Sequence, residues 1–184
     1  LILVTGPTGA GKTSTLYAML STLNNGDRNI ITIEDPIEYN LSGITQIQVN
    51  HKAKLDFATI LRAILRHDPD VIMLGEIRDS ITANIAIQAS LTGHLVISTL
   101  HTNNALATVQ RFMQLGIASS LLAESIKAIL GQRLIRVLCN RCKIIAPVPM
   151  EQTYLHAHGI ERAAYPQGCE HCHHRGYLGR SGLY

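Results

Sequence analysis

Tryptophan is absent from this sequence, and aromatic and charged residues are scarce. Aromatic residues make up 4% of the 184 residues and charged residues 16%, against 46% apolar residues. So few charges exclude an intrinsically disordered chain, and the composition also excludes collagen and coiled coil. No apolar run reaches about 18 residues and no signal-peptide pattern is present, so neither a membrane span nor export is indicated. We expect one compact domain with room for an appendage.

Cysteine is missing from residues 1–138. All four cysteines lie within residues 139–184, with five of the nine histidines and three of the six prolines, in a stretch with little apolar periodicity. We therefore predict a domain boundary near Leu138, with a main domain over 1–138 and a smaller one over 139–184. Because the first residue is Leu1 and a buried-strand pattern starts there, we also expect a fragment whose smaller domain is truncated at its end.

Short apolar runs alternate with helical patterns over most of the main domain. Runs that are apolar throughout are typical of parallel strands covered on both faces, and we predict four, at 1–4, 30–33, 71–74 and 95–98. Helices are predicted at about 12–23, 57–65, 81–89, 104–115 and 119–130. Strands that alternate with helices indicate a doubly wound α/β sheet.

The first predicted strand is followed by a phosphate-binding motif. Residues 6–13 fit G-x-x-x-x-G-K-[ST] and stand between a strand and a helix, the context that this motif requires. Its glycines let backbone N–H groups converge on phosphate oxygens, and the helix N-terminus adds the positive end of its dipole. Lys12 would bridge the β- and γ-phosphates of ATP, and the Thr13 hydroxyl would ligate Mg²⁺. A glycine-rich turn with an incidental lysine is the alternative. The predicted nucleotide-binding residues are Gly6, Pro7, Thr8, Gly9, Ala10, Gly11, Lys12, Thr13 and Ser14.

An acidic residue follows the predicted strand at 71–74. Glu76 comes two residues after it, a position from which a glutamate activates the attacking water more readily than it ligates the metal. The alternative is an exposed strand-end glutamate. Glu34, Asp35 and Glu38 similarly follow the strand at 30–33, at the edge where α/β proteins bind ligands.

Two histidines flank the strand predicted at 95–98. His101 follows it and could donate a hydrogen bond to a γ-phosphate. His94 precedes it, and we interpret that residue as part of a capped surface loop.

Four segments together resemble one family, the secretion ATPase superfamily that powers type II secretion and type IV pilus assembly. They are GPTGAGKTSTLYAML from Gly6 (Walker A), ITIEDPIEY from Ile31 (aspartate box), LRAILRHDPDVIMLGEIRD from Leu61 (Walker B) and TGHLVISTLHTNNA from Thr92 (histidine box). They follow the family's order and spacing. With the Gln-Arg-Leu element at 132–134, they cover nearly all of residues 1–136.

The resemblance implies a RecA-like fold and a hexameric ring of identical chains that hydrolyses ATP. Lys12 and Thr13 match the family's nucleotide and Mg²⁺ residues, Glu76 its catalytic glutamate, Glu38 the aspartate-box glutamate near metal and water, and His101 the histidine on the γ-phosphate side. The resemblance also implies a cytoplasmic protein, peripheral at the inner face of the bacterial inner membrane. Its partner there would be an inner-membrane platform protein, and the motor would drive assembly of pilin-like subunits.

The arginines of the matching segments have no single assignment. Arg62, Arg66 and Arg78 could each reach across a ring interface, or form structural ion pairs. His67 departs from the family pattern, which has glutamine there. A larger departure is that the family's N-terminal domains, which cover the nucleotide and bind the platform, are not in this sequence.

The cysteines form two C-x₂-C pairs, Cys139 with Cys142 and Cys169 with Cys172. Four thiolates complete a closed tetrahedral Zn²⁺ site, and this spacing is typical of one. Disulfides are the alternative, which a reducing cytosol disfavours. The family's assembly members carry a similar insert and its retraction branch lacks it, so the resemblance implies assembly or secretion. Neighbouring histidines could replace a thiolate or be solvated; they are His171, His173 and His174.

A formal net charge of +3 suggests a second function class, a DNA-transport ring or nucleic-acid-binding module. Against it, no block of Lys and Arg is present, and bound Zn²⁺ lowers the charge to +1 because four thiolates contribute −4 and the ion +2. Basic and aromatic residues do not alternate either. We expect no nucleic-acid partner and no membrane insertion. The host system, whether secretion apparatus, pilus or DNA-uptake pseudopilus, is left open.

Overall fold

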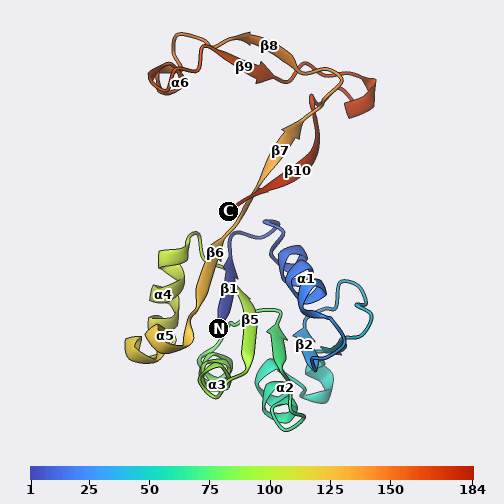
Figure 1. Ribbon diagram of the computed structural model, residues 1–184, viewed down its shortest axis with the longest axis vertical. Coiled ribbons are helices and arrows are strands. Elements are labelled where there is room, and N and C mark those ends of the chain that lie inside the picture. Colours follow the sequence, from blue (N-terminus) through green and yellow to red (C-terminus); the bar gives the residue numbers. More distant parts are fainter. The chain divides into compact units, whose positions relative to one another are not determined.

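A computed structural model describes all residues from 1 to 184. The chain forms two units, Leu1–Arg133 and Leu134–Leu183 (Figure 1). Strand β7 (Arg133–Leu138) pairs with β10 (Tyr177–Leu183), so the residues directly before Cys139 belong with the second unit. The boundary expected near Leu138 stays a prediction. None of the helices combines the length and hydrophobicity that crossing a membrane requires.

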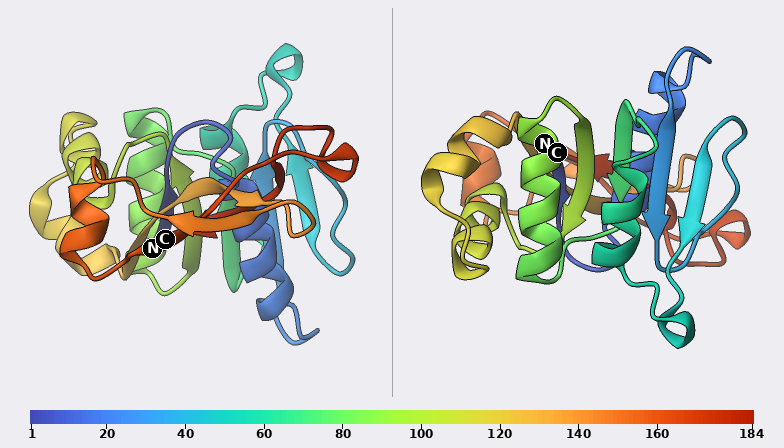
Figure 2. Two further views of the ribbon diagram at one scale, coloured as in Figure 1. Left: turned by 90° about the horizontal axis from the view of Figure 1, so that it is seen from above. Right: turned by 90° about the horizontal axis from the view of Figure 1, so that it is seen from below.

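Six parallel strands form the sheet of the first unit, in the order β3-β2-β4-β5-β1-β6 (Figure 2). Strand β1 lies between β5 and the edge strand β6, with Ile2 opposite Ile97 on one side and Ala128 on the other. This confirms the predicted α/β class with a mostly parallel sheet. The strands are β1 (Ile2–Thr5), β2 (Ile30–Glu34), β3 (Thr45–Gln48), β4 (Val71–Leu74), β5 (Leu95–Leu100) and β6 (Ala128–Gly131).

Helices cover both faces of this sheet, which explains why its strands are apolar throughout. Side chains alternate across each strand, so Val4 and Met73 pack in the cluster under α1, whereas Leu3 and Leu74 join the cluster formed with helices on the opposite face. The helices are α1 (Lys12–Leu23), α2 (Phe57–Ile64), α3 (Ser80–Leu91), α4 (Ala105–Gln114) and α5 (Ser119–Ser125), with a 3₁₀ turn at His51–Ala53.

One predicted helix is wrong in its second half. The expected helix at 119–130 ends at Ser125, and residues 128–131 form β6. The backbone N–H of Lys127 donates to the carbonyl of Leu1 at 2.8 Å, and the following residues pair with β1. Pairing with the sheet edge therefore overrides a helical pattern that was read from local spacing. Strand β3 was not predicted, because Thr45–Gln48 is short and all its residues except Ile47 are polar.

The second unit contains two pairs of strands and little apolar core. Besides β7 and β10, β8 (Ile144–Pro147) pairs antiparallel with β9 (Arg162–Tyr165), and between them lies α6 (Thr153–Ala157). A 3₁₀ turn spans Glu170–Cys172. The buried cluster of this unit consists of cysteines.

Candidate functional site

The carboxyl ends of the parallel strands meet at one edge of the first unit's sheet. Gly6 follows β1, Glu34 ends β2, Glu76 follows β4 by one intervening residue, His101 follows β5 and Gln132 follows β6. The structure thus brings the phosphate motif, the acidic segments and the histidine segment to the edge where the sequence predicted a ligand.

Helix α1 begins without a side-chain cap, in contrast to α2, α3 and α4. Asp56, Asp79 and Asn104 cap α2, α3 and α4 by accepting backbone N–H groups at 2.7, 2.8 and 2.8 Å. Helix α1 instead starts after Gly11, which has a φ of 81°, and its first turn contains no acidic residue. The free N–H groups and the helix dipole leave this end available to an anion.

Lys12 lies inside the phosphate motif, close to its backbone. Its Nζ atom donates to the carbonyl oxygens of Gly6 at 2.9 Å and Pro7 at 3.0 Å. Burial lowers the pKa of Lys12, while the charge of Glu76 acts in the opposite direction. The ammonium group of Lys12 therefore lies where phosphate oxygens can replace the two loop carbonyl oxygens as its hydrogen-bond acceptors. Thr13 and Ser14 are exposed on the first turn of α1.

Gln132 supports the phosphate motif, a role that the sequence analysis missed. It is 4% exposed, and its amide donates to the Ala10 carbonyl at 2.7 Å and accepts the Thr15 hydroxyl at 2.8 Å. Its backbone N–H donates to the Thr5 carbonyl at 2.8 Å. The backbone of Gly6 approaches the Gln132 carbonyl so closely that any Cβ at position 6 would collide with that oxygen.

The carboxylate of Glu76 contacts two cationic or polar side chains. Arg78 pairs with its Oε1 atom at 2.5 Å, and His101 Nε2 lies 3.5 Å from its Oε2 atom. The hydrogen bond with Glu76 raises the pKa of Arg78. The turn that carries Glu76 is fixed by the Thr99 hydroxyl, which donates to the Gly75 carbonyl at 2.7 Å. Atom Oε2 is buried without a hydrogen-bond partner, so it is free to accept a proton.

Glu38 does not join Glu76 in this structure. It is exposed on the loop between β2 and β3, and its carboxylate forms no ion pair or hydrogen bond. Its backbone N–H donates to the Tyr17 hydroxyl at 3.4 Å. Asp35, in the same segment, lies 3.5 Å from His51.

The other arginines and the second histidine named in the sequence analysis differ in the ion pairs and hydrogen bonds that they form. Arg62 and Arg66 are exposed and form no ion pair within the chain, whereas Arg78 pairs with Glu76. His94 lies at the C-terminus of α3 with Nδ1 3.0 Å from the Ala89 carbonyl oxygen, as expected for a capped loop.

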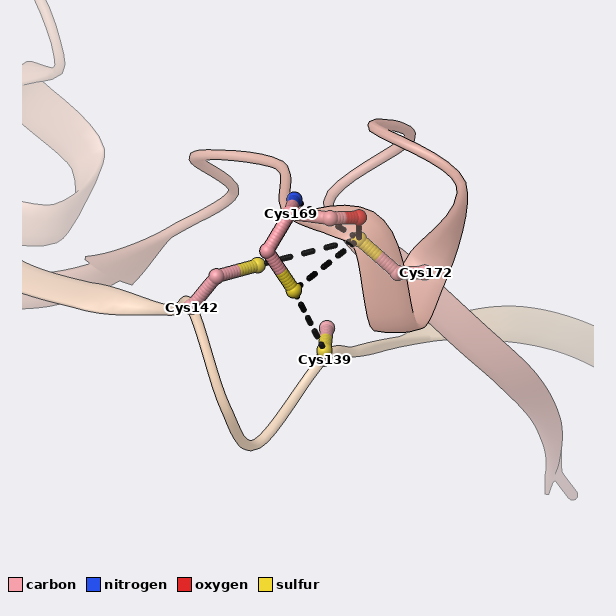
Figure 3. Close-up of side chains that lie close together, drawn as sticks. All are labelled: Cys139, Cys142, Cys169 and Cys172. Carbon is pink, nitrogen blue, oxygen red and sulfur yellow. Dashed lines mark hydrogen bonds between the residues drawn. The ribbon is translucent and has the colours of Figure 1, made fainter.

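The four cysteine sulfurs of the second unit converge on one point (Figure 3). They lie within 4.8 Å of one another, with separations of 4.0 Å for Cys139–Cys169, 3.8 Å for Cys142–Cys172 and 3.9 Å for Cys169–Cys172. Tetrahedral zinc with Zn–S bonds of about 2.3 Å requires sulfurs about 3.8 Å apart. No disulfide joins them. The donor set and its spacing therefore fit Zn²⁺.

Backbone N–H groups surround these sulfurs, as around metal-bound thiolates. Gly168 donates to Cys142 Sγ at 3.3 Å, and Cys169 and Gly176 donate to Cys172 Sγ at 3.3 and 3.2 Å. Burial by itself would raise the pKa of Cys172, but the bonds from Cys169 and Gly176 lower it, which favours the thiolate. The neighbouring histidines are exposed and outside the cluster; they are His171, His173 and His174.

Comparison with known proteins gives matches over the whole chain. Residues 1–184 match the family model described as Type II/IV secretion system protein. Type II secretion system protein E of Aeromonas hydrophila is 56% identical over 189 aligned residues, and type II secretion system ATPase E of Vibrio cholerae is 52% identical over 187. Both alignments cover 100% of this chain, which spans 37% of the length of these relatives.

Solved structures of secretion and pilus motors have the same fold. The pilus retraction motor PilT with bound ADP superposes with a TM-score of 0.68 at 42% identity, over 78% of this chain and 43% of that one. The ATPase DotB of Legionella pneumophila gives a TM-score of 0.63 at 28% identity, over 89% of this chain and 43% of that one. With the family model matched from the first residue to the last, the chain belongs to the Type II/IV secretion system protein family, the secretion ATPases.

Proposed function

We propose that this chain is the ATP-hydrolysing domain of a motor for type II secretion or for type IV pilus or pseudopilus assembly. One observation carries the proposal: an uncapped helix N-terminus, Lys12 and Glu76 meet at one sheet edge. Relatives named type II secretion system protein E support the choice of machine, and the fold shared with the pilus retraction motor PilT supports a motor ATPase.

In this proposal the phosphate motif binds ATP through the N–H groups of residues 6–14, and Lys12 exchanges its loop carbonyls for phosphate oxygens. Glu76 accepts a proton from the water that attacks the γ-phosphorus, and ADP leaves as the bond to the terminal phosphoryl group breaks. The free Oε2 atom of Glu76 supports this role. Thr13 would supply a hydroxyl ligand for Mg²⁺, and the charge of the ion would stabilise the negative charge that develops on the departing ADP.

His101 and Glu38 complete the proposed site. The Nε2 atom of His101 lies beside the Glu76 carboxylate, which is the group that accepts the proton in this proposal. Glu38 is assigned to the region of metal and water because its loop follows β2 at the same sheet edge. The carboxylate is exposed and unpaired, so no bond within the chain holds it away from a ligand.

We also propose a homohexameric ring that is cytoplasmic and acts on an inner-membrane platform protein. PilT, which is named as a pilus retraction motor, and DotB, which is named as an ATPase, share this fold. Arg62 and Arg66 are exposed and unpaired, and are therefore available to a neighbouring chain. Arg78 is engaged by Glu76 and would first have to leave it.

We assign residues 1–138 to an ATPase core and the cysteine-bearing residues 139–184 to a structural zinc subdomain, as in the sequence-based division. Cys139, Cys142, Cys169 and Cys172 would hold one Zn²⁺, with no ligand position left for water. The ion would stabilise the fold rather than take part in catalysis, since no acidic or histidine side chain joins the four cysteines of the cluster.

Replacing Lys12 tests the nucleotide assignment. In the intact protein, Lys12→Ala should abolish ATP turnover, together with secretion or pilus assembly, because the only lysine in the motif neutralises phosphate charge. Phosphate release and nucleotide binding are the measurements. Lys127→Ala is a matched control, since Lys127 is exposed and precedes β6 at the opposite edge of the sheet. Turnover that survives in Lys12→Ala would refute the proposal.

A further inference from the structure

Glu34 is a buried carboxylate that the proposed chemistry does not use. It is 2% exposed, and no lysine, arginine or histidine lies within ion-pair distance. Burying an unpaired charge is unfavourable unless hydrogen bonds replace its hydration. Thr32 Oγ1 donates to Glu34 Oε1 at 2.6 Å, Gln46 Nε2 donates to the same atom at 3.0 Å, and the Tyr17 hydroxyl donates to Oε2.

Two of these donors also hold the loop that joins β2 to β3 and carries Glu38. Gln46 accepts the Leu41 N–H at 2.6 Å and donates to the Tyr39 carbonyl at 3.2 Å. The Tyr17 hydroxyl accepts the Glu38 N–H at 3.4 Å, and the two tyrosine rings meet edge to face with centroids 4.7 Å apart. Tyr17 lies on α1, next to β2 (Figure 1), so the network joins the helix of the phosphate motif to this loop.

The direction of these hydrogen bonds requires an acceptor at position 34. Because the Leu41 N–H occupies Oε1 of Gln46, the amino group of Gln46 must face Glu34. Because the Tyr17 oxygen takes the Glu38 N–H, its proton points to Glu34. Burial and the Glu34 carboxylate raise the pKa of Tyr17 to about 12, so the hydroxyl keeps that proton at physiological pH. Only a carboxylate at position 34 has two oxygens that can accept both of these hydrogen bonds.

We propose that Tyr17, Glu34 and Gln46 are positioning residues that fix the loop carrying Glu38 against α1. This inference rests on the proposed function, because the position of that loop affects ATP turnover only if the site hydrolyses ATP. None of the three residues belongs to the phosphate motif. Displacing a reacting group by about 1 Å can lower a rate by about a hundredfold. Loosening the loop therefore lowers kcat and leaves nucleotide affinity unchanged.

The first test compares two tyrosines in the intact protein. Tyr17→Phe removes the hydroxyl that bonds Glu34 and the Glu38 N–H, and should lower kcat by about ten- to a hundredfold. Tyr39→Phe is the matched control, because Tyr39 is 58% exposed and its hydroxyl bonds no residue. Kd and stoichiometry for a fluorescent ATP analogue with Mg²⁺ should match wild type in both variants. A protein that is merely misfolded would lose binding stoichiometry instead.

The second test reverses the polarity of one pair. Glu34→Gln leaves one donor without an acceptor, because the amide oxygen can face Gln46 or Tyr17 but not both. Gln46→Glu leaves two carboxylates facing each other. Each variant should therefore lower kcat and expose the Leu41 amide to faster hydrogen exchange. The double variant E34Q/Q46E restores a donor opposite an acceptor. The kcat of the double variant should exceed that of the less active single variant by at least about tenfold. A double-mutant cycle measures this coupling between the two positions.

Failure of this inference is distinct from failure of the proposed function. Turnover that survives in Lys12→Ala refutes the proposed function. A Tyr17→Phe variant with wild-type kcat, beside an inactive Lys12→Ala variant, refutes the positioning role alone. Equal losses of nucleotide affinity and kcat in Tyr17→Phe also overturn it, because they would place the effect on the phosphate motif. If Tyr17→Phe does not fold, absence of rescue in E34Q/Q46E overturns the inference, and rescue supports it.

Discussion

At the scale of single residues, the site depends on how two charges are held. The Lys12 ammonium is bonded only to carbonyls of its own loop, so a phosphate can take it over without breaking an ion pair. The Glu76 carboxylate is bonded through Oε1 to Arg78, whereas Oε2 accepts no hydrogen bond and lies 3.5 Å from His101 Nε2. Binding and proton acceptance are therefore assigned to different side chains.

Changing Glu76 to glutamine should separate these two functions. Glu76→Gln keeps the size of the side chain and an oxygen for Arg78, so the nucleotide Kd should stay within about threefold of wild type. Hydrolysis should fall by at least about a hundredfold, because the amide cannot accept the proton of water. Nucleotide binding and phosphate release measure the two effects. Glu124→Gln, an exposed glutamate on α5, is the control. Loss of binding in Glu76→Gln would contradict a role confined to hydrolysis.

At the scale of elements, the phosphate motif is shaped by a strand far from it in sequence. Gln132, directly after β6, bonds the Ala10 carbonyl within the motif and the Thr15 hydroxyl on α1. Its carbonyl faces Gly6 at a separation that only glycine permits. Strand β6 therefore does more than extend the sheet, since its end sets the loop that precedes α1.

Replacing Gln132 by leucine should weaken both stability and nucleotide binding. Leucine fills a similar volume but leaves the buried Ala10 carbonyl without its donor, which costs about 1–3 kcal/mol. Urea unfolding should show this loss, and nucleotide Kd should rise because the motif is less ordered. Gln110→Leu is the matched control, as Gln110 is exposed on α4 and makes no hydrogen bond with its side chain. Unchanged Kd in Gln132→Leu would argue against the supporting role.

At the scale of the whole molecule, the two units are stabilised by different means. The first has clusters of buried aliphatic side chains on both faces of its sheet. In the second, the buried cluster consists of cysteines, while Ile145, Met150 and Leu183 are 64%, 82% and 56% exposed. A unit of this size without an apolar core requires a metal or another cross-link.

Removing the metal should therefore unfold one unit and spare the other. A strong chelator should release about one zinc ion per chain, and limited proteolysis should then cut within 134–183 but not within 1–133. Nucleotide binding should persist, because the phosphate motif and Gln132 belong to the first unit. Elemental analysis measures the zinc. Intact protein that contains no metal, or loses none on unfolding, would contradict the assignment.

Much of the site could be predicted because its signals are local. The glycines and Lys12 lie within eight consecutive residues, and Glu76 and His101 come two and three residues after the ends of apolar strand patterns. The parallel sheet then had to place them at one edge. The spacing of the cysteine pairs likewise predicted their cluster, since each pair presents two sulfurs from one short turn.

The sequence by itself determined the α/β class, the phosphate motif and the four sulfurs, because each depends on neighbours in the chain. Only the tertiary structure decided that residues 128–131 are a strand, that Gln132 supports the motif and that Tyr17 and Gln46 meet at Glu34. These contacts join residues from 12 to 122 positions apart. Periodicity describes one segment at a time, whereas strand pairing and buried hydrogen bonds are selected by the partner that the fold brings close.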